Sequence, residues 1–103
     1  MHVLRVKYLK SLRQASLGLL AAVEAYPVFF KTRFGIHTFF MKYSIDVLIL
    51  DKAGRVIALK ENLKPFRIFL WNPLFDRVIE LPKGTIESER IQTNSTVKLV
   101  FLA

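Results

Sequence analysis

The chain contains no cysteine, and this absence removes a wide range of chemistry. Disulfides, thiolate nucleophiles, zinc ribbons and iron–sulfur clusters all require cysteine sulfur, so this chain forms none of them alone. Histidine is nearly as scarce, because His37 is the only one besides His2. Since multi-histidine metal sites need several imidazoles, the sequence predicts no metal site and no resident cofactor.

Acidic residues are half as numerous as basic ones. Sixteen Lys and Arg face eight Asp and Glu, which gives a formal net charge of +8. Such a charge attracts phosphate backbones and anionic lipid head groups. The basic residues are dispersed and form no run, so two interpretations stay open. They form a surface that binds nucleic acid or another polyanion, or they are a solvated surface that keeps a chain with 52% apolar residues soluble.

Long apolar runs are also missing, because no stretch approaches the ~20 residues that cross a bilayer. We therefore expect no membrane span. Residues 1–25 resemble a secretory signal peptide in having basic residues before the apolar stretch 17–23. The basic region is long for such a signal, and Glu24 is charged where a cleavage site is usually bland. We therefore expect a folded segment and a cytoplasmic protein, with export as the alternative.

Length and apolar content predict one domain over residues 1–103. Apolar and polar residues alternate over 2–9, which predicts a strand. Residues 11–26 place apolar side chains at helical spacing, with Ser11 as a cap and Pro27 after the end, which predicts a helix. Open strand edges in so apolar a chain also suggest a homo-oligomer.

The remainder of the chain predicts short strands. The clearest signal is a hairpin in which 45–51 and 55–61 flank a turn at Gly54. Further strands are predicted over residues 28–34, 36–41, 65–71, 75–81 and 96–102, and a single helical turn within 85–95. The expected fold is α+β and mainly antiparallel β: a small barrel- or sandwich-like sheet of six or seven short strands with one N-terminal helix.

The segment IHTFFMKYSIDVLILDKAGRVIALKENLKPFR, followed by VIELPKGTI, resembles the domain of unknown function 192 family. The shared features are a His-Thr-Phe-Phe-Met segment, an Ile-Asp-Val strand, an Asp-x-x-Gly turn, an Asn-Leu-x-Pro step and a Leu-Glu-Leu-Pro-x-Gly motif. This chain departs from the family at Ser44, usually proline, at residues 93–95, usually containing Gly-Asp, and at Ala15, usually arginine. The resemblance implies a compact, mainly β fold, with cytoplasmic and exported members and no established activity.

Six polar or unusual residues are the candidate ligand-binding set: His37, Thr38, Met41, Asp46, Asn62 and Glu80. His37 is either a proton carrier or ligand contact, or a histidine hydrogen-bonded at a strand end. Asp46 lies among apolar strand residues, so it must meet a cation or a backbone amide, or else line a pocket.

The other polar candidates also have two interpretations. Asn62 either contacts a ligand or satisfies the backbone of its own turn. Glu80 either contacts a ligand or holds Lys83 and the glycine turn beside it.

A serine hydrolase would use Ser44, His37 and Asp46 as a triad. Side chains alternate along a strand, so His37 is expected to point away from the other two, and the chain has no Gly-x-Ser-x-Gly elbow. We therefore assign no catalytic residue.

The leading hypothesis is a non-enzymatic binding or accessory domain. Its pocket near His37, Met41 and Asp46 would hold a small polar molecule or a peptide end. The alternative is nucleic-acid or polyanion binding, in which some of the four aromatics between residues 65 and 75 stack on bases or sugars. The third hypothesis is an enzyme of unknown reaction.

Overall fold

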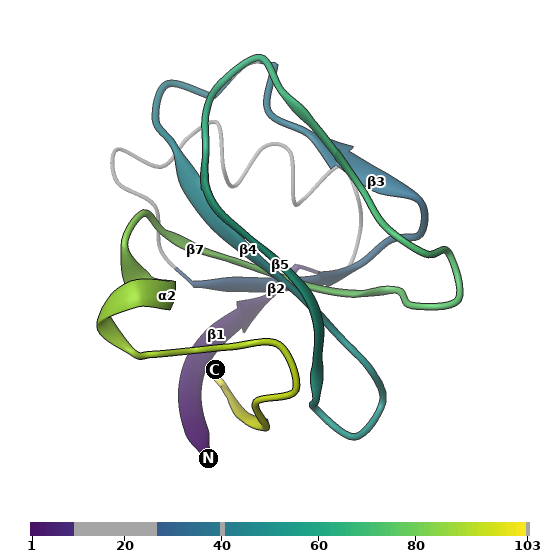
Figure 1. Cartoon of the computed structure of the whole chain (residues 1–103), viewed down its shortest axis with the longest axis vertical. Helices are drawn as coiled ribbons and strands as arrows, with labels where there is room; N and C mark the ends of the chain where they lie inside the picture. Colours follow the sequence, from purple (N-terminus) through teal and green to yellow (C-terminus); the bar gives the residue numbers. More distant parts are fainter. Residues whose placement is uncertain (10–26, 40, 103) are drawn as a thin grey trace.

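The computed structural model describes residues 1–9, 27–39 and 41–102. In this part of the chain, eight strands and one short helix follow each other in order (Figure 1). They are β1 (His2–Tyr8), β2 (Val28–Lys31), β3 (Gly35–His37), β4 (Ile45–Leu50), β5 (Val56–Leu63), β6 (Ile68–Leu70), β7 (Arg77–Pro82), α2 (Thr85–Ser88) and β8 (Val97–Phe101).

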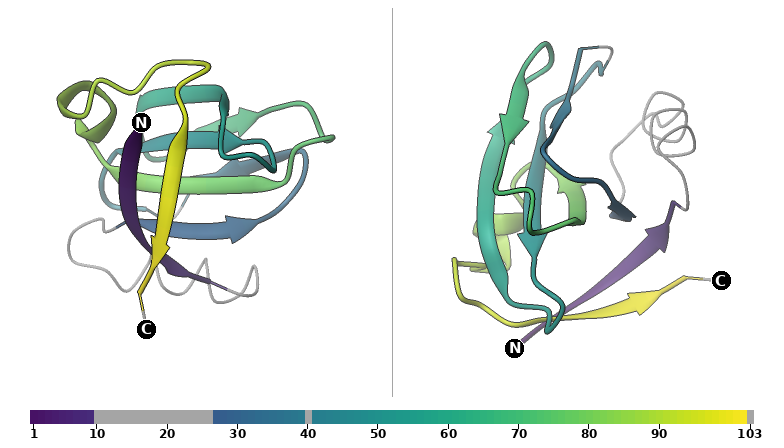
Figure 2. Two further views of the ribbon diagram at one scale, coloured as in Figure 1. Left: turned by 90° about the horizontal axis from the view of Figure 1, so that it is seen from below. Right: turned by 90° about the vertical axis from the view of Figure 1, so that its right-hand side faces the viewer.

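Six strands form one curled sheet in the order β5-β4-β7-β2-β1-β8. The pairs β5–β4, β4–β7 and β7–β2 are antiparallel, whereas β1 is parallel to both β2 and β8. Figure 2 shows β8, in yellow, running beside β1, in purple. Strands β3 and β6 form a separate two-stranded antiparallel sheet. Although β4 and β5 lie between them in the chain, the pair is called here the β3–β6 hairpin for its shape alone.

The curled sheet nearly closes where its two edge strands begin. Val56 N–H donates to Ser95 O at 2.9 Å, and Val97 N–H donates to Gly54 O at 2.8 Å. Gly54 has φ +86, and a Cβ on it would lie 2.5 Å from Val97 O, so this contact requires glycine. The result is a half-barrel joined at one end by backbone hydrogen bonds.

Both faces of the sheet are buried at its centre, where all six residues of β4 are buried, whereas one face of β1 is exposed. The inner core lies within the curl and takes residues from all six strands and α2: Leu4, Val6, Phe29, Leu48, Leu50, Val56, Ile79, Leu81, Ile86, Ile91 and Val97. The outer core lies under the β3–β6 hairpin and contains Leu9, Val28, Phe30, Met41, Ile45, Val47, Ile49, Leu63 and Val78. Strand alternation therefore decides on which face each β4 side chain lies.

The β-rich, mainly antiparallel class predicted from the sequence is confirmed, with three differences. The described strands number eight because the β3–β6 hairpin forms its own sheet, and the strand predicted over 36–41 already ends at His37. The parallel pairing of β1 with both neighbours is an addition. The predicted N-terminal helix falls within residues 10–26, outside the described residues, and is not confirmed; the described residues contain only the short helix α2.

Candidate functional site

Asp46 lies on the inner face of β4 and is buried. Its Oδ1 accepts a hydrogen bond from Asn62 N–H, and its Oδ2 accepts one from Ile86 N–H, both at 2.9 Å. Both carboxylate oxygens are thus used by backbone amides from two distant segments. The sequence left a cation, a backbone amide and a pocket as possible surroundings for Asp46. The structure shows two backbone amides as its hydrogen-bond donors.

Local backbone geometry explains why these two amides need Asp46. The β4–β5 register shifts between Ile45 and Val47, and Asn62 has φ +53, so β5 bulges and the Asn62 amide leaves the ladder. Helix α2 begins after Gly84 without a side-chain cap, so the Ile86 amide is one of its unpaired first-turn donors. Asp46 therefore joins the bulge of β5 to the start of α2.

Asn62 is exposed and belongs to this bulge. Asparagine tolerates the left-handed conformation better than other non-glycine residues, which explains the residue type. The Asn62 N–H is satisfied by Asp46 Oδ1, so the predicted role of the asparagine side chain toward its own turn stays a prediction.

Thr38 is buried after the end of β3 and connects two segments. Its hydroxyl donates to Lys64 O at 2.6 Å and accepts from Arg67 N–H at 3.0 Å. Its carbonyl oxygen accepts from Phe66 N–H at 3.0 Å and from Met41 N–H at 3.2 Å. These bonds hold segment 64–67 beside segment 38–41.

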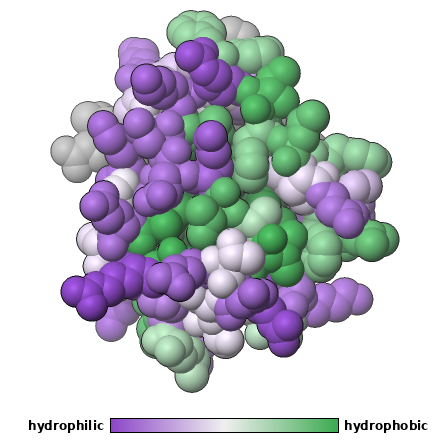
Figure 3. All heavy atoms as spheres, in the orientation of Figure 1, coloured by the Kyte–Doolittle hydropathy of each residue, from purple (hydrophilic) through white to green (hydrophobic). Residues whose placement is uncertain are grey.

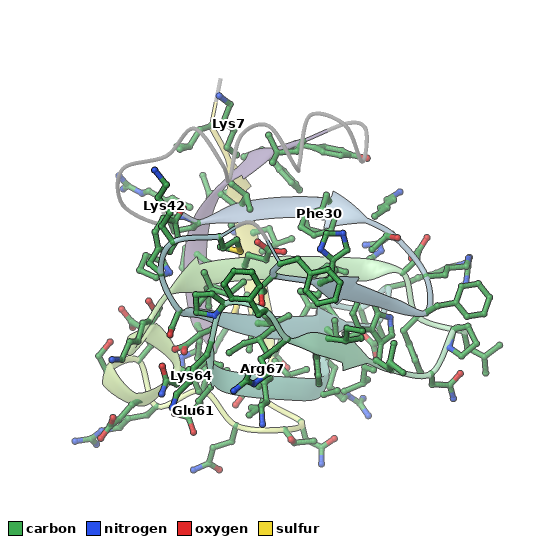
Figure 4. The ribbon with its side chains drawn as sticks, turned by 90° about the horizontal axis from the view of Figure 1, so that it is seen from above. Lys7, Phe30, Lys42, Glu61, Lys64 and Arg67 are labelled. Atoms are coloured by element: carbon green, nitrogen blue, oxygen red, sulfur yellow. The ribbon has the colours of Figure 1, made fainter. Side chains whose placement is uncertain are left out.

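Between these two segments lies an open surface hollow, called here the hairpin depression, with a volume of about 550 Å³. It is lined by Phe39, Met41, Lys42, Pro65 and Phe66. Figure 4 looks onto this end of the molecule and shows Lys42 on one side and Lys64 and Arg67 on the other. The depression thus combines apolar walls with a border that carries Lys42, Lys64 and Arg67, and Figure 4 shows the acid Glu61 beside Lys64.

His37 is exposed next to this depression, at the end of β3. Its ring stacks on Phe39 with centroids 4.9 Å apart and planes at 27°, and Phe39 N–H donates to its Nδ1 at 3.4 Å. The imidazole therefore extends the aromatic wall that Phe39 contributes to the depression.

Glu80 is buried on β7, on the outer-core face of the sheet. Its cross-strand neighbours are the fully buried Val28 and Val47. Burial raises the pKa of Glu80 to about 8. Among the described residues its Oε2 has no hydrogen-bond partner. The nearby turn is held instead by Thr85, whose hydroxyl donates to Pro82 O at 2.6 Å.

The six predicted residues therefore occupy three places. His37, Thr38 and Met41 meet at the hairpin depression. Asp46 and the backbone of Asn62 meet on the inner face. Glu80 lies on the outer-core face, where Met41 is also a member of the outer core. Because the Asp46 carboxylate serves backbone amides on the inner face, it does not orient the His37 ring, and a Ser44 triad is not formed.

Four residues of the depression were not predicted: Phe39, Lys42, Pro65 and Phe66. The sequence signal for these four residues was the aromatic and basic content of two loops. That the two loops are adjacent is shown only by the hydrogen bonds of Thr38 in the structure. In the parts of the chain that the structure describes, no group of three or more His, Asp or Glu is arranged to hold a metal ion. No helix among the described residues is long and apolar enough to cross a membrane.

Comparison with known proteins finds a match to one family over nearly the whole chain. The model of the family DUF192, described as "Uncharacterized ACR, COG1430", matches residues 2–99. A UPF0127 protein of Pyrococcus horikoshii is 34% identical over 99 residues, which are 90% of this chain and 85% of that protein. A UPF0127 protein of Pyrococcus abyssi is 36% identical over 73 residues, 69% of this chain and 62% of that protein.

Two crystal structures share the fold. A protein of Sinorhizobium meliloti 1021, provisionally described as a transcription regulator, superimposes with a TM-score of 0.71 at 16% identity, covering 86% of this chain and 76% of that one. A protein of unknown function from Novosphingobium aromaticivorans gives a TM-score of 0.73 at 14% identity, covering 86% and 70%. At such identities the similarity extends to the fold alone.

Proposed function

Because the chain belongs to the DUF192 family of uncharacterised proteins, we propose its function from the geometry of the site: a non-enzymatic domain that binds the carboxyl-terminal end of a peptide in the hairpin depression. The observation that carries this proposal is the joining of an apolar hollow to a lysine. Phe39, Met41 and Phe66 offer apolar contact, and Lys42 offers a positive charge at the edge. A peptide end has the matching parts, an apolar side chain and a carboxylate.

Hydrogen bonding to Thr38 supports this proposal. Its side chain and backbone already hold segments 38–41 and 64–67 together without a ligand. A preformed site avoids the entropy cost of ordering loops on binding. The volume of about 550 Å³ is also in the range of ligand pockets, roughly 300–1,000 Å³. Because the depression is open to solvent, we expect weak binding, with a Kd on the order of 100 μM, or about −5.5 kcal/mol.

The alternative of nucleic-acid binding is less well supported. Of the four aromatics between residues 65 and 75, Phe69, Trp71 and Phe75 pack against the outer core, and only Phe66 is exposed. The Trp71 indole N–H also donates to Phe75 O at 2.8 Å. Stacking on successive bases needs several exposed rings, so this segment lacks the platform that the alternative requires.

The test is an NMR titration of the ¹⁵N-labelled full chain with short peptides that end in an apolar residue. Peptides with a free carboxylate should shift the amide signals of residues 38–42 and 64–67, and the same peptides with an amidated end should bind at least tenfold more weakly. Lys42→Gln should remove this difference, whereas Lys52→Gln, in the turn between β4 and β5, should retain it. Equal binding of both peptide forms, or shifts confined to other residues, would contradict the proposal.

A further inference from the structure

Several large apolar side chains are exposed on and around the β3–β6 hairpin. They are 60–77% exposed and are called here the apolar ridge: Phe34, Phe66, Ile68, Leu70 and Leu74. Figure 3 shows hydrophobic surface extending from the top of the molecule down its right-hand edge, the side on which β3 is labelled in Figure 1. Single exposed apolar residues are common on soluble proteins, but a contiguous group marks an interaction surface.

Strand alternation on β6 creates the centre of the ridge. Phe69 packs against the outer core, so Ile68 and Leu70 on either side of it point outward. Leu70 lies opposite Gly35 in the hairpin, and a Cβ on Gly35 would be 2.5 Å from Leu70 Cδ2. The Leu70 side chain thus rests across the glycine and stays on the outer surface.

Two aromatic members of the ridge are presented by turns. Phe34 has φ +75 and Phe66 has φ +61, left-handed conformations that are unfavourable for a residue other than glycine. Burial does not compensate for this cost, since both rings are more than half exposed. The backbone therefore holds the two rings outward at the borders of the hairpin.

The surroundings of the ridge are strongly basic. Segments 31–43 and 60–77, which contain the hairpin and its flanks, hold two acids, Glu61 and Asp76, and seven basic residues: Lys31, Arg33, Lys42, Lys60, Lys64, Arg67 and Arg77. The charge of Asp76 is already matched by Arg33, whose Nη2 lies 3.7 Å from Asp76 Oδ2. Any partner that covers the ridge must therefore offer apolar contact and negative charge together.

This charge distinguishes between possible occupants. A second copy of the chain would bring two basic surfaces together, which is unfavourable. A nucleic acid would use the charge but has no apolar layer to receive Ile68, Leu70 and Leu74. A bilayer with anionic head groups has both, because apolar side chains enter the boundary between head groups and acyl chains while Lys and Arg remain at the phosphates.

We propose that the apolar ridge binds reversibly to the surface of an anionic lipid bilayer, with Leu70 and Leu74 inserted and the surrounding lysines and arginines at the head groups. Leu70 ends β6 and Leu74 lies in the turn that follows, and both side chains are exposed, which suits insertion better than enclosure of a peptide. The proposal does not rest on peptide binding: Phe66 and Lys42 belong to both surfaces, whereas Leu70 and Leu74 lie outside the hairpin depression.

The test is co-sedimentation of the full chain with vesicles of phosphatidylcholine alone or with 30% phosphatidylserine. We expect at least tenfold tighter binding to the anionic vesicles, and weaker binding as salt rises from 0.05 to 0.5 M. The double variant Leu70→Ser/Leu74→Ser should lose at least tenfold in vesicle affinity. The double variant Val3→Ser/Leu102→Ser, which changes exposed apolar residues near the two termini, should bind like the unmodified chain.

A second readout separates insertion from simple charge attraction. Trp71 is the only tryptophan and directly follows β6, so lipids brominated on their acyl chains should quench its fluorescence in the unmodified chain and not in the Leu70/Leu74 variant. Equal sedimentation of that variant, or anionic binding without quenching, would overturn the proposal. The proposal would also be overturned if light scattering showed that the unmodified chain is a dimer and that the Leu70/Leu74 variant is a monomer. Peptide-induced NMR shifts should persist in the ridge variant, so the two proposals fail separately.

Discussion

Asp46 and Glu80 are buried carboxylates on neighbouring strands of one sheet, but on opposite faces, and their surroundings differ completely. Asp46 faces the inner core and accepts a hydrogen bond on each oxygen. Glu80 faces the outer core between two valines, and its Oε2 has no partner among the described residues. Burial alone therefore does not reveal the role of an acid. Asp46 organises the backbone, whereas burial raises the pKa of the Glu80 carboxyl.

The largest expected effect comes from Asp46. Asp46→Ala leaves the buried amide of Ile86 and the partly buried amide of Asn62 without an acceptor. The first loss costs about 1–3 kcal/mol and the second about 0.5–1.5 kcal/mol, so the free energy of unfolding should fall by about 2–4 kcal/mol. Asp46→Asn keeps one carbonyl acceptor and should lose about half as much. Urea denaturation measures both. A loss below about 0.5 kcal/mol for the alanine variant would show that water replaces the carboxylate.

Glu80 should make the stability depend on pH in the opposite sense to most acids. The folded chain keeps this proton up to about pH 8, whereas the unfolded chain releases it near the ordinary pKa of 4.5. Between these values the unfolded state binds fewer protons, so stability falls as pH rises, by about 1.4 kcal/mol per pH unit, and the dependence ends above pH 8.

The variant Glu80→Gln should abolish this slope, and denaturation series from pH 5 to 9 measure it. The control is Glu89→Gln, which removes an exposed acid and should leave the slope unchanged. If the Glu80 variant retains the slope, another group is responsible for it.

A smaller loss is expected at Thr38, which joins the two loops of the depression. Thr38→Val keeps the shape but removes the hydroxyl from Lys64 O and Arg67 N–H, so stability should fall by about 1–3 kcal/mol. Peptide affinity should fall with it, because segment 64–67 is no longer held beside segment 38–41. Thr38→Ser keeps the hydroxyl and should restore most of both quantities in denaturation and NMR titration.

The smallest effect is expected at His37. Its side chain is exposed and stacks on Phe39, so His37→Ala creates no sealed cavity and should change the free energy of unfolding by less than about 1 kcal/mol. Peptide affinity should fall several-fold, because the stacked ring extends the wall of the depression. A stability loss comparable to that of Asp46→Ala would instead assign His37 to the fold.

The candidate site shows where sequence reasoning succeeds for individual residues and fails for their combination. Asp46 lies away from His37, but the two residues are on different strands, β4 and β3, so alternation along one strand is not the reason. The left-handed conformation of Asn62 suits asparagine. A pocket was predicted around His37, Met41 and Asp46. In the structure only His37 and Met41 lie near each other, because Asp46 is on the inner face. Whether His37, Met41 or Glu80 contacts a ligand stays a prediction; the NMR titration tests it for His37 and Met41.

The sequence by itself determined the elements with local causes, namely the β4–β5 hairpin around Gly54 and most of the short strands. It also excluded cysteine chemistry and carried the resemblance to the family. Periodicity and turn residues act over a few positions, so they can be recognised in one chain. Only the tertiary structure decided the parallel position of β1 between β2 and β8, the partners of Asp46 and the meeting of the two loops at Thr38. The physical reason is separation along the chain. The Asp46 carboxylate bonds to amides 16 and 40 residues away, and no local pattern encodes such contacts.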